Sequence, residues 1–189
     1  YYLASGSPCV DAGTNAASER GLTNYTTRTD GIKDTGLVDL GYHYSAGLDP
    51  NAITDLYVAP NGDNGYSGTN WAEAYRTIGK ALSVAQEGTR IHVGAGSYTN
   101  GLEAFPLALT NLMGIQILGA NRATTVIDAT GSSNRVLALY NCPGVTLSEL
   151  TFTGGYQTNS ASPIGGGIAL CSCAGAVLSG CVIGNNMLA

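Results

Sequence analysis

Two stretches near the end of the chain align with each other without a gap. Residues 137–155 read LALYNCPGVTLSELTFTGG, and residues 168–186 read IALCSCAGAVLSGCVIGNN, an offset of 31 positions. Cys142 falls on Cys173 and Leu147 on Leu178 in this alignment. An ungapped internal match of this length indicates a repeat architecture, in which each unit stacks on the one before it.

Each copy contains short apolar and β-branched runs that are separated by Gly, Asn and Ser. The runs are Val145–Leu147, Leu150–Phe152, Ala176–Leu178 and Cys181–Ile183. Such a pattern is typical of short strands joined by tight turns. A coil of about this length, made of strands with corners between them, is the unit of a parallel β-helix. We therefore predict an all-β solenoid.

A short helix is predicted ahead of the repeats. In residues 77–85 the apolar side chains recur at helical spacing, with Thr77 as a candidate N-cap and Gly88 as a candidate stop signal. Strands are expected before it, at 56–58, and after it, at 90–93, 107–110, 115–118 and 125–128. One helix followed by stacked strands is the pattern of a capped solenoid, with the helix covering the open end of the first coil.

The composition excludes two classes of partner. Charged residues make up 11% of the 189-residue chain, against roughly 25% in an average soluble domain. The formal net charge is −5, whereas binding to a phosphate backbone needs clustered Lys and Arg. No apolar run approaches the length of a membrane span. We therefore expect neither nucleic-acid binding nor membrane insertion.

The five cysteines leave three interpretations open. They are Cys9, Cys142, Cys171, Cys173 and Cys181. They can serve as small buried apolar residues in the coils. Alternatively, the aligned pair Cys142 and Cys173 would stack one strand spacing apart, which makes it the candidate disulfide. A metal site formed by Cys171, Cys173 and Cys181 would lack the usual CxxC spacing.

Three carboxylates near the start of the chain form a candidate calcium site. Asp30, Asp34 and Asp39 all lie inside one ten-residue loop that contains Gly. Carboxylates gathered on such a loop can bind Ca²⁺, although this spacing is not that of an EF-hand. Asp-Gly sequences are also ordinary turn chemistry. Both the calcium site and the structural turns remain open, and no other cofactor is expected.

Residues 55–189 resemble a known family, the pectin-lyase-like right-handed parallel β-helices of bacterial secreted and surface proteins. The resemblance rests on LYVAPNGD at 56–63, TIGKAL at 77–82, QEGTRIHV at 86–93 and GAGSYT at 94–99, together with the coil pattern from Gly144 to Phe152. It implies a right-handed parallel β-helix with a short N-terminal capping helix. It also implies a bacterial protein that acts outside the cell or at its surface.

Residues 1–44 resemble the opposite end of the same family. SPCVDAG at 7–13 and VDLGYHY at 38–44 are similar to the segment that closes such β-helices. Residues 45–54, with Gly47 and Asp49-Pro50, then read as a linker. The order is therefore a closing segment, a linker, and the cap and first coils of a β-helix. Either the chain is a slice of tandem β-helices, or the closing segment of one molecule caps the next.

The second coil runs to Asn186 without a closing cap of its own. An open β-helix end is a template for pairing. We hypothesise that residues 1–44 of another copy, or further coils of the parent chain, cover this end. Repeated head-to-tail capping without ring closure gives a fibre. The candidate assembly residues are Cys9, Val10, Val38 and Leu40 in the closing segment and Val182 and Ile183 in the last coil.

Three functions remain to be separated. The resemblance admits a polysaccharide lyase or epimerase, but Asp128, Arg122, Arg135, His92 and Glu103 form no paired-acid pattern along the repeat. We assign no catalytic residue. A carbohydrate-binding module is the second alternative, because tyrosines such as Tyr57 and Tyr66 could stack on glycans or pack around the caps. Our first interpretation is an extracellular structural or adhesive protein, a rod or filament subunit that associates with itself.

Overall fold

The computed structural model describes residues 3–23, 25–28, 32–41, 44–45, 54–157 and 165–188. The chain divides into two compact units, Tyr1–Ile53 and Thr54–Ala189. Most of the predicted linker and Asp30 lie outside the described residues. Among the described residues, no helix has the length and apolar character needed to cross a bilayer.

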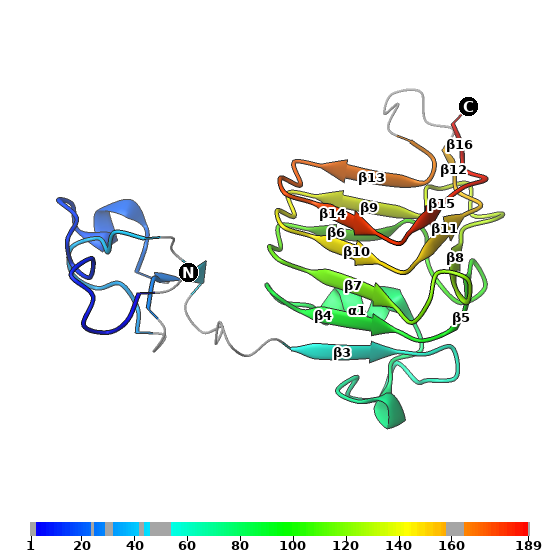
Figure 1. Cartoon of the computed structure of the whole chain (residues 1–189), viewed down its shortest axis with the longest axis horizontal. Coiled ribbons are helices and arrows are strands. Elements are labelled where there is room, and N and C mark those ends of the chain that lie inside the picture. The colour runs from blue at the N-terminus through cyan, green and yellow to red at the C-terminus, as the bar shows by residue number, and fades with distance from the viewer. Residues whose placement is uncertain are drawn as a thin grey trace. The chain divides into compact units, whose positions relative to one another are not determined.

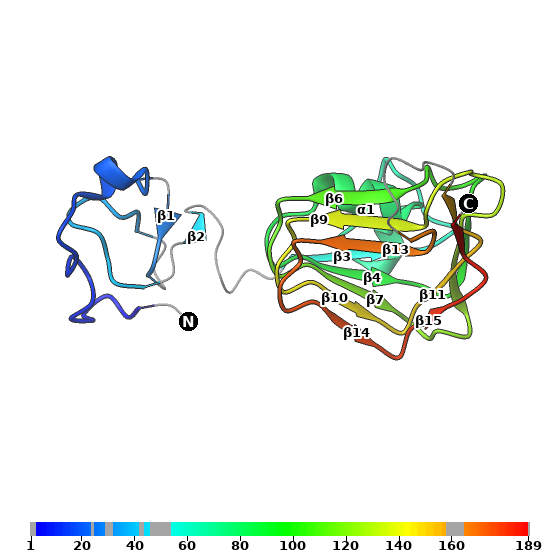
Figure 2. The same ribbon diagram turned by 90° about the horizontal axis from the view of Figure 1, so that it is seen from above.

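The larger unit is a right-handed parallel β-helix, which confirms the predicted fold (Figures 1 and 2). Its coils stack on one another, and their strands form three parallel sheets. The first sheet contains β3 (Asp55–Val58), β4 (Arg90–Val93), β7 (Gln116–Gly119), β10 (Thr146–Ser148) and β14 (Val177–Ser179). The second contains β5 (Gly96–Thr99), β8 (Thr125–Asp128), β11 (Thr151–Thr153) and β15 (Val182–Ile183). The third contains β6 (Leu107–Thr110), β9 (Leu137–Tyr140) and β13 (Ile168–Cys171), while β12 (Tyr156–Gln157) pairs with β16 (Met187–Leu188).

Strand register confirms the repeat read from the sequence. Leu137 pairs with Ile168, and Leu147 pairs with Leu178, as the offset of 31 requires. One coil earlier, Leu147 pairs with Ile117. Equivalent side chains therefore stack in columns along the axis of the β-helix.

Alternation along each strand sends every second side chain into the core. In the first sheet, the inward column contains Leu56, Ile91, Ile117 and Leu147, each at most 4% exposed. The inward columns of the other two sheets are buried in the same way: Tyr98, Ile127 and Phe152 in the second, and Leu107, Leu137 and Leu139 in the third. Each large side chain buried in these columns contributes roughly 1.5–3 kcal/mol.

The corner that follows the third sheet is built from stacked residues in the left-handed conformation. Asn111 and Asn141 have φ of 58° and 54°, and Asn141 Nδ2 donates to Asn111 Oδ1 at 3.0 Å. Asn tolerates this region better than most residues. Gly144, three positions beyond Asn141, has φ of 70° and stacks on Gly114, which has the same φ. The same turn is thus repeated from coil to coil.

The N-terminal end of the β-helix is closed. Helix α1 (Ile78–Val84) begins as predicted, because Thr77 Oγ1 accepts a hydrogen bond from the Lys80 N–H at 3.0 Å. It buries Ile78, Ala81 and Leu82 and packs against β6 and β3. The helix ends at Val84, before the predicted stop at Gly88, because Ala85 adopts an extended backbone.

The outer edge of β3 is also covered. The Tyr57 N–H donates to the carbonyl of Gly68, and the Tyr75 N–H donates to the carbonyl of Tyr57, both at 2.8 Å. The intervening loop carries the 3-10 helix η2 (Trp71–Glu73). The edge strand is therefore satisfied by its own chain and is not a template for pairing.

The described residues of the smaller unit contain little regular structure. It contains the 3-10 helix η1 (Ala17–Arg20) and an antiparallel pair of short strands, β1 (Tyr25–Thr26) and β2 (Tyr44–Ser45). Among its described residues, Ala17 is the apolar side chain that is fully buried, whereas Leu37 and Leu40 are 46% and 55% exposed. The described part of this unit therefore buries little apolar surface.

Candidate functional site

The last described coil exposes the side chains that its predecessors bury. Leu178 is 42% exposed, while Leu147, its partner in the same column, is fully buried. Ile183 is 49% exposed, while its partner Phe152 is fully buried. The cause is position: within the described residues, no further coil covers β14 and β15 (Figure 1).

Four more apolar side chains of the same coil are exposed. They are Val177, Val182, Met187 and Leu188, at 46–60% exposure. With Leu178 and Ile183 they form the surface that we call the open end. Clustered exposure of this kind marks an interaction surface more often than scattered single residues do. Val182 and Ile183 were predicted as assembly residues, and the structure places both on this surface.

The predicted assembly residues of the smaller unit also lie near one another. The Leu40 N–H donates to the carbonyl of Cys9 at 2.8 Å, and the Gly13 N–H donates to the carbonyl of Val38 at 2.7 Å. Leu40 is exposed, and Cys9, Val10 and Val38 are half-buried. The unit therefore has apolar groups that could contact a partner.

Asp34 and Asp39 lie together, with Asp11 as the third carboxylate of the group. Asp30, the third predicted ligand, lies outside the described residues. Asp39 accepts from the Asp11 N–H at 2.7 Å and from the Thr27 hydroxyl, and Asp34 accepts from the Asp39 N–H at 3.0 Å. These carboxylates hold loop backbone, so the structure gives them a structural role. Calcium binding stays a prediction.

Cys142 and Cys173 occupy equivalent positions in adjacent coils, as the extension of the β9–β13 register requires. Both are thiols in the structure, and the sulfur of each lies within hydrogen-bonding distance of two backbone carbonyls. For Cys142 these are the carbonyls of Leu109 and Tyr140. Cys142 is buried and Cys173 is half-buried near the open end. The disulfide between them stays a prediction.

Sequence reasoning missed an ionic group on the outer face of the first sheet. Arg90 donates twice to the Asp55 carboxylate, at 2.8 Å in each bond, and His92 Nε2 lies 2.7 Å from Asp55 Oδ1. The hydrogen bonds from Arg90 are the main reason why the pKa of Asp55 lies below its usual value. The signal in the sequence is the pair of alternating strands DLYV and RIHV, whose outward residues fall opposite one another.

Glu103 is a buried carboxylate with a helix-capping role. Its two oxygens accept from the backbone N–H groups of Ile78 and Gly79, at 2.6 and 3.0 Å. Burial raises the pKa of Glu103, and the two hydrogen bonds oppose that shift. The carboxylate borders an open hollow of about 450 Å³, lined mainly by the 102–108 segment and the start of α1.

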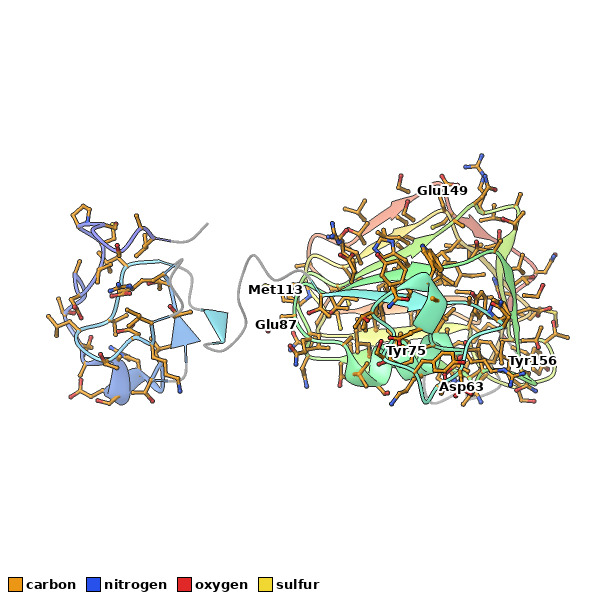
Figure 3. All side chains as sticks on the ribbon, turned by 90° about the horizontal axis from the view of Figure 1, so that it is seen from below. Asp63, Tyr75, Glu87, Met113, Glu149 and Tyr156 are labelled. Atoms are coloured by element: carbon orange, nitrogen blue, oxygen red, sulfur yellow. The ribbon has the colours of Figure 1, made fainter. Side chains whose placement is uncertain are left out.

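The other candidate catalytic residues are dispersed. Arg122 lies beside Glu149 in the turns between the first and second sheets, with Nη1 and Oε1 3.9 Å apart. Asp128 accepts from the Thr130 N–H at 2.9 Å. Glu149 lies across the β-helix from Asp63 and Tyr75 (Figure 3). Arg135 is 5% exposed in the segment that precedes β9. Of these candidates, Arg122 has an acidic neighbour in Glu149 and His92 has one in Asp55, but neither pair contains two carboxyl groups.

Comparison with known proteins identifies a family. The profile of the family described as "Protein of unknown function (DUF1565)" matches residues 60–165. No curated protein matches the chain. Among solved structures, the chain is similar to pectin methylesterase from carrot, with 20% identity and a TM-score of 0.42. That alignment covers 73% of this chain and 40% of the carrot protein, so this chain spans about two fifths of the length of that relative.

Proposed function

We propose that this chain, which belongs to the DUF1565 family of parallel β-helix proteins, is a non-catalytic structural unit that assembles head to tail through its open end. The observation that carries the proposal is the contrast between the first coil and the last coil that the structure describes. Helix α1 and the 59–75 loop cover the first coil, whereas the last described coil exposes its core positions.

The open end offers two kinds of interaction. Its apolar side chains are roughly half exposed, so covering each of them would contribute about 1 kcal/mol. In addition, β13, β14 and β15 are the outermost described strands of their sheets. Backbone N–H and C=O groups along such edges form a template for another strand. An extended segment with apolar side chains would satisfy both.

The proposed partner is the smaller unit of a second copy. Its sequence resembles the closing segment of such β-helices, and it exposes Leu37 and Leu40. The contact joins two different surfaces, so each addition leaves a new open end. A heterologous contact that does not close on itself produces a filament.

We place this assembly outside the cell or at its surface. The low content of charged residues and the Thr-, Ser- and Asn-rich exterior suit a structural element that makes lateral contacts. The dispersion of Asp128, Glu103 and His92 over separate parts of the coil favours the structural function over a lyase or epimerase.

Sedimentation of the full chain over a range of concentrations tests the proposal. Wild type is expected to form larger species as its concentration rises, and Ile183→Asp is expected to remain monomeric because it buries an unpaired charge in the contact. Tyr66→Asp is the matched control, since Tyr66 is 51% exposed and lies in the 59–75 loop, away from the open end. It should assemble like wild type. Assembly by Ile183→Asp at wild-type concentrations, or a strictly monomeric folded wild type, would contradict the proposal.

A further inference from the structure

The outward side chains of the first two strands form a compact group. Along β3 and β4 the burial alternates, so Asp55, Tyr57, Arg90 and His92 face outward. Strand register sets Asp55 opposite Arg90 and Tyr57 opposite His92. The four side chains thus occupy one patch of the first sheet, remote in the stack from β14 and the open end.

Aromatic rings are packed in order across this patch. The rings of Tyr57 and His92 stack with their centroids 4.9 Å apart and their planes at 17°. Trp71 meets Tyr57 edge to face, at 4.9 Å and 69°. Trp71 is nevertheless 53% exposed. A large aromatic side chain therefore presents about half of its surface to solvent at the end of an ordered aromatic row.

The position of Trp71 is fixed by its neighbours. It begins η2, and the Asn70 side chain caps this turn by accepting from the N–H groups of Ala72 and Glu73, at 2.9 and 3.0 Å. Trp71 also lies against Gly94, where an added Cβ would come within 3.2 Å of its ring. A ring that is already held in place loses little conformational entropy when it binds a partner.

The patch contains charged groups that largely compensate each other. The two hydrogen bonds from Arg90 neutralise Asp55, and the side chains of Asp55, Arg90 and His92 are 29%, 36% and 30% exposed. They offer hydrogen-bonding atoms at the surface without a strong field. Such a patch fits a neutral partner rich in hydroxyl groups better than a polyanion or a polycation.

The surface beyond the patch has the same character. The strands β7, β10 and β14 continue the outer face with the sequences QILG, TLS and VLS, which contain no charged residue. Their outward polar residues are Gln116, Thr146, Ser148 and Ser179. A polymer that leaves the aromatic row would therefore meet further amide and hydroxyl groups.

We propose that Trp71, Tyr57 and the Asp55–Arg90–His92 group form a binding site for a neutral polysaccharide. The apolar face of a sugar ring would stack on Trp71, and its hydroxyl groups would bond to His92 and Arg90. Exposed aromatic surface combined with a few fixed polar groups is the usual composition of such a site. A stacked nucleic acid is disfavoured by the acidic net charge.

This site is tested by comparing the polysaccharide binding of wild type with that of the variant Trp71→Ala. The probes are soluble glucan, xylan and mannan, with polygalacturonate as the charged comparison. Trp71 is the single tryptophan of the chain, so its fluorescence reports occupancy directly. We expect at least one neutral polymer to shift that fluorescence in wild type. Gel retardation by the same polymer should weaken tenfold or more in Trp71→Ala. It should be unchanged in Tyr140→Ala, because Tyr140 is 38% exposed on β9, in the third sheet.

The assembly-deficient Ile183→Asp variant separates this site from the proposed function, because it should retain polysaccharide binding per molecule. Three outcomes would overturn the proposal: no fluorescence change with any neutral polymer, equal retardation of wild type and Trp71→Ala, or binding of polygalacturonate alone. If wild type binds a neutral polymer but does not assemble, only the head-to-tail function is refuted.

Discussion

Leu147 and Leu178 form a matched pair for testing how the last coil differs from the coils beneath it. They are the same residue type, they pair directly in register, and they face the same core column. Leu147 is fully buried, whereas Leu178 is 42% exposed. We predict that alanine at these two positions has very different effects on the stability of the dilute protein.

The expected costs follow from burial. Leu147→Ala removes a side chain that packs between Ile117 and Leu178, so it leaves a cavity and should cost about 2–5 kcal/mol. Leu178→Ala removes a side chain that already contacts solvent. It loses about half of the transfer free energy and encloses no cavity, so its cost should be about 1 kcal/mol.

Urea denaturation followed by Trp71 fluorescence measures both costs. Trp71 lies in the β-helix unit, so its signal reports that unit and not the smaller one. The difference should be measured below the concentration at which assembly begins. At higher concentration the cost of Leu178→Ala should rise toward that of Leu147→Ala, because assembly buries Leu178. Equal costs in the dilute protein would refute the view that the last coil is uncovered.

Three further predictions concern single side chains. Because the pKa of Glu103 is raised, the folded chain binds the proton of this carboxyl group more tightly than the unfolded chain does. Wild type should therefore gain stability as the pH falls from neutral toward 4.5, and Glu103→Gln should lack this gain. Because Arg90 lowers the pKa of Asp55, the ionised carboxylate should stabilise the fold above pH 3.8, and this stabilisation should disappear as the pH falls below that value. At this partly exposed site the contribution should be about 1 kcal/mol or less. Asp55→Asn should lack it. Maleimide should label Cys173 faster than the buried Cys142 in dilute protein, and assembly should slow the labelling of Cys173.

Each of these predictions has a defined contrary result. An unchanged pH dependence in Glu103→Gln would show that another group causes the acid stabilisation. Parallel acid-denaturation curves for wild type and Asp55→Asn would refute the role of the Arg90 pair. Two cysteines that resist maleimide until a reductant is added, and that appear as one linked peptide by mass spectrometry, would establish the Cys142–Cys173 disulfide.

Much of the β-helix could be predicted because its determinants are local or periodic. The offset of 31 gave the register of Leu147 with Leu178, since identical patterns stack in a solenoid. The start of α1 was correct because a Thr77 cap needs only the next three residues. Strand β5 was missed, because Tyr98 is the single inward apolar residue within its four positions.

Features that depend on distant contacts could not be predicted. The Asp55 group joins strands 35 residues apart, so its partners become visible only when the register is known. The position of Trp71 depends on such contacts as well, because the 59–75 loop folds back onto β3 and places the ring against Tyr57 and Gly94. The joining of Asp11 to Asp34 and Asp39 likewise depends on how a loop closes.

Electron microscopy of the full chain at rising concentration tests the central claim most directly. If the smaller unit of one copy covers the open end of the next, unbranched filaments should lengthen with concentration, and Ile183→Asp should show single particles under the same conditions. Isolated particles of wild type at every concentration, with circular dichroism that confirms a folded β-helix, would contradict assembly through the open end.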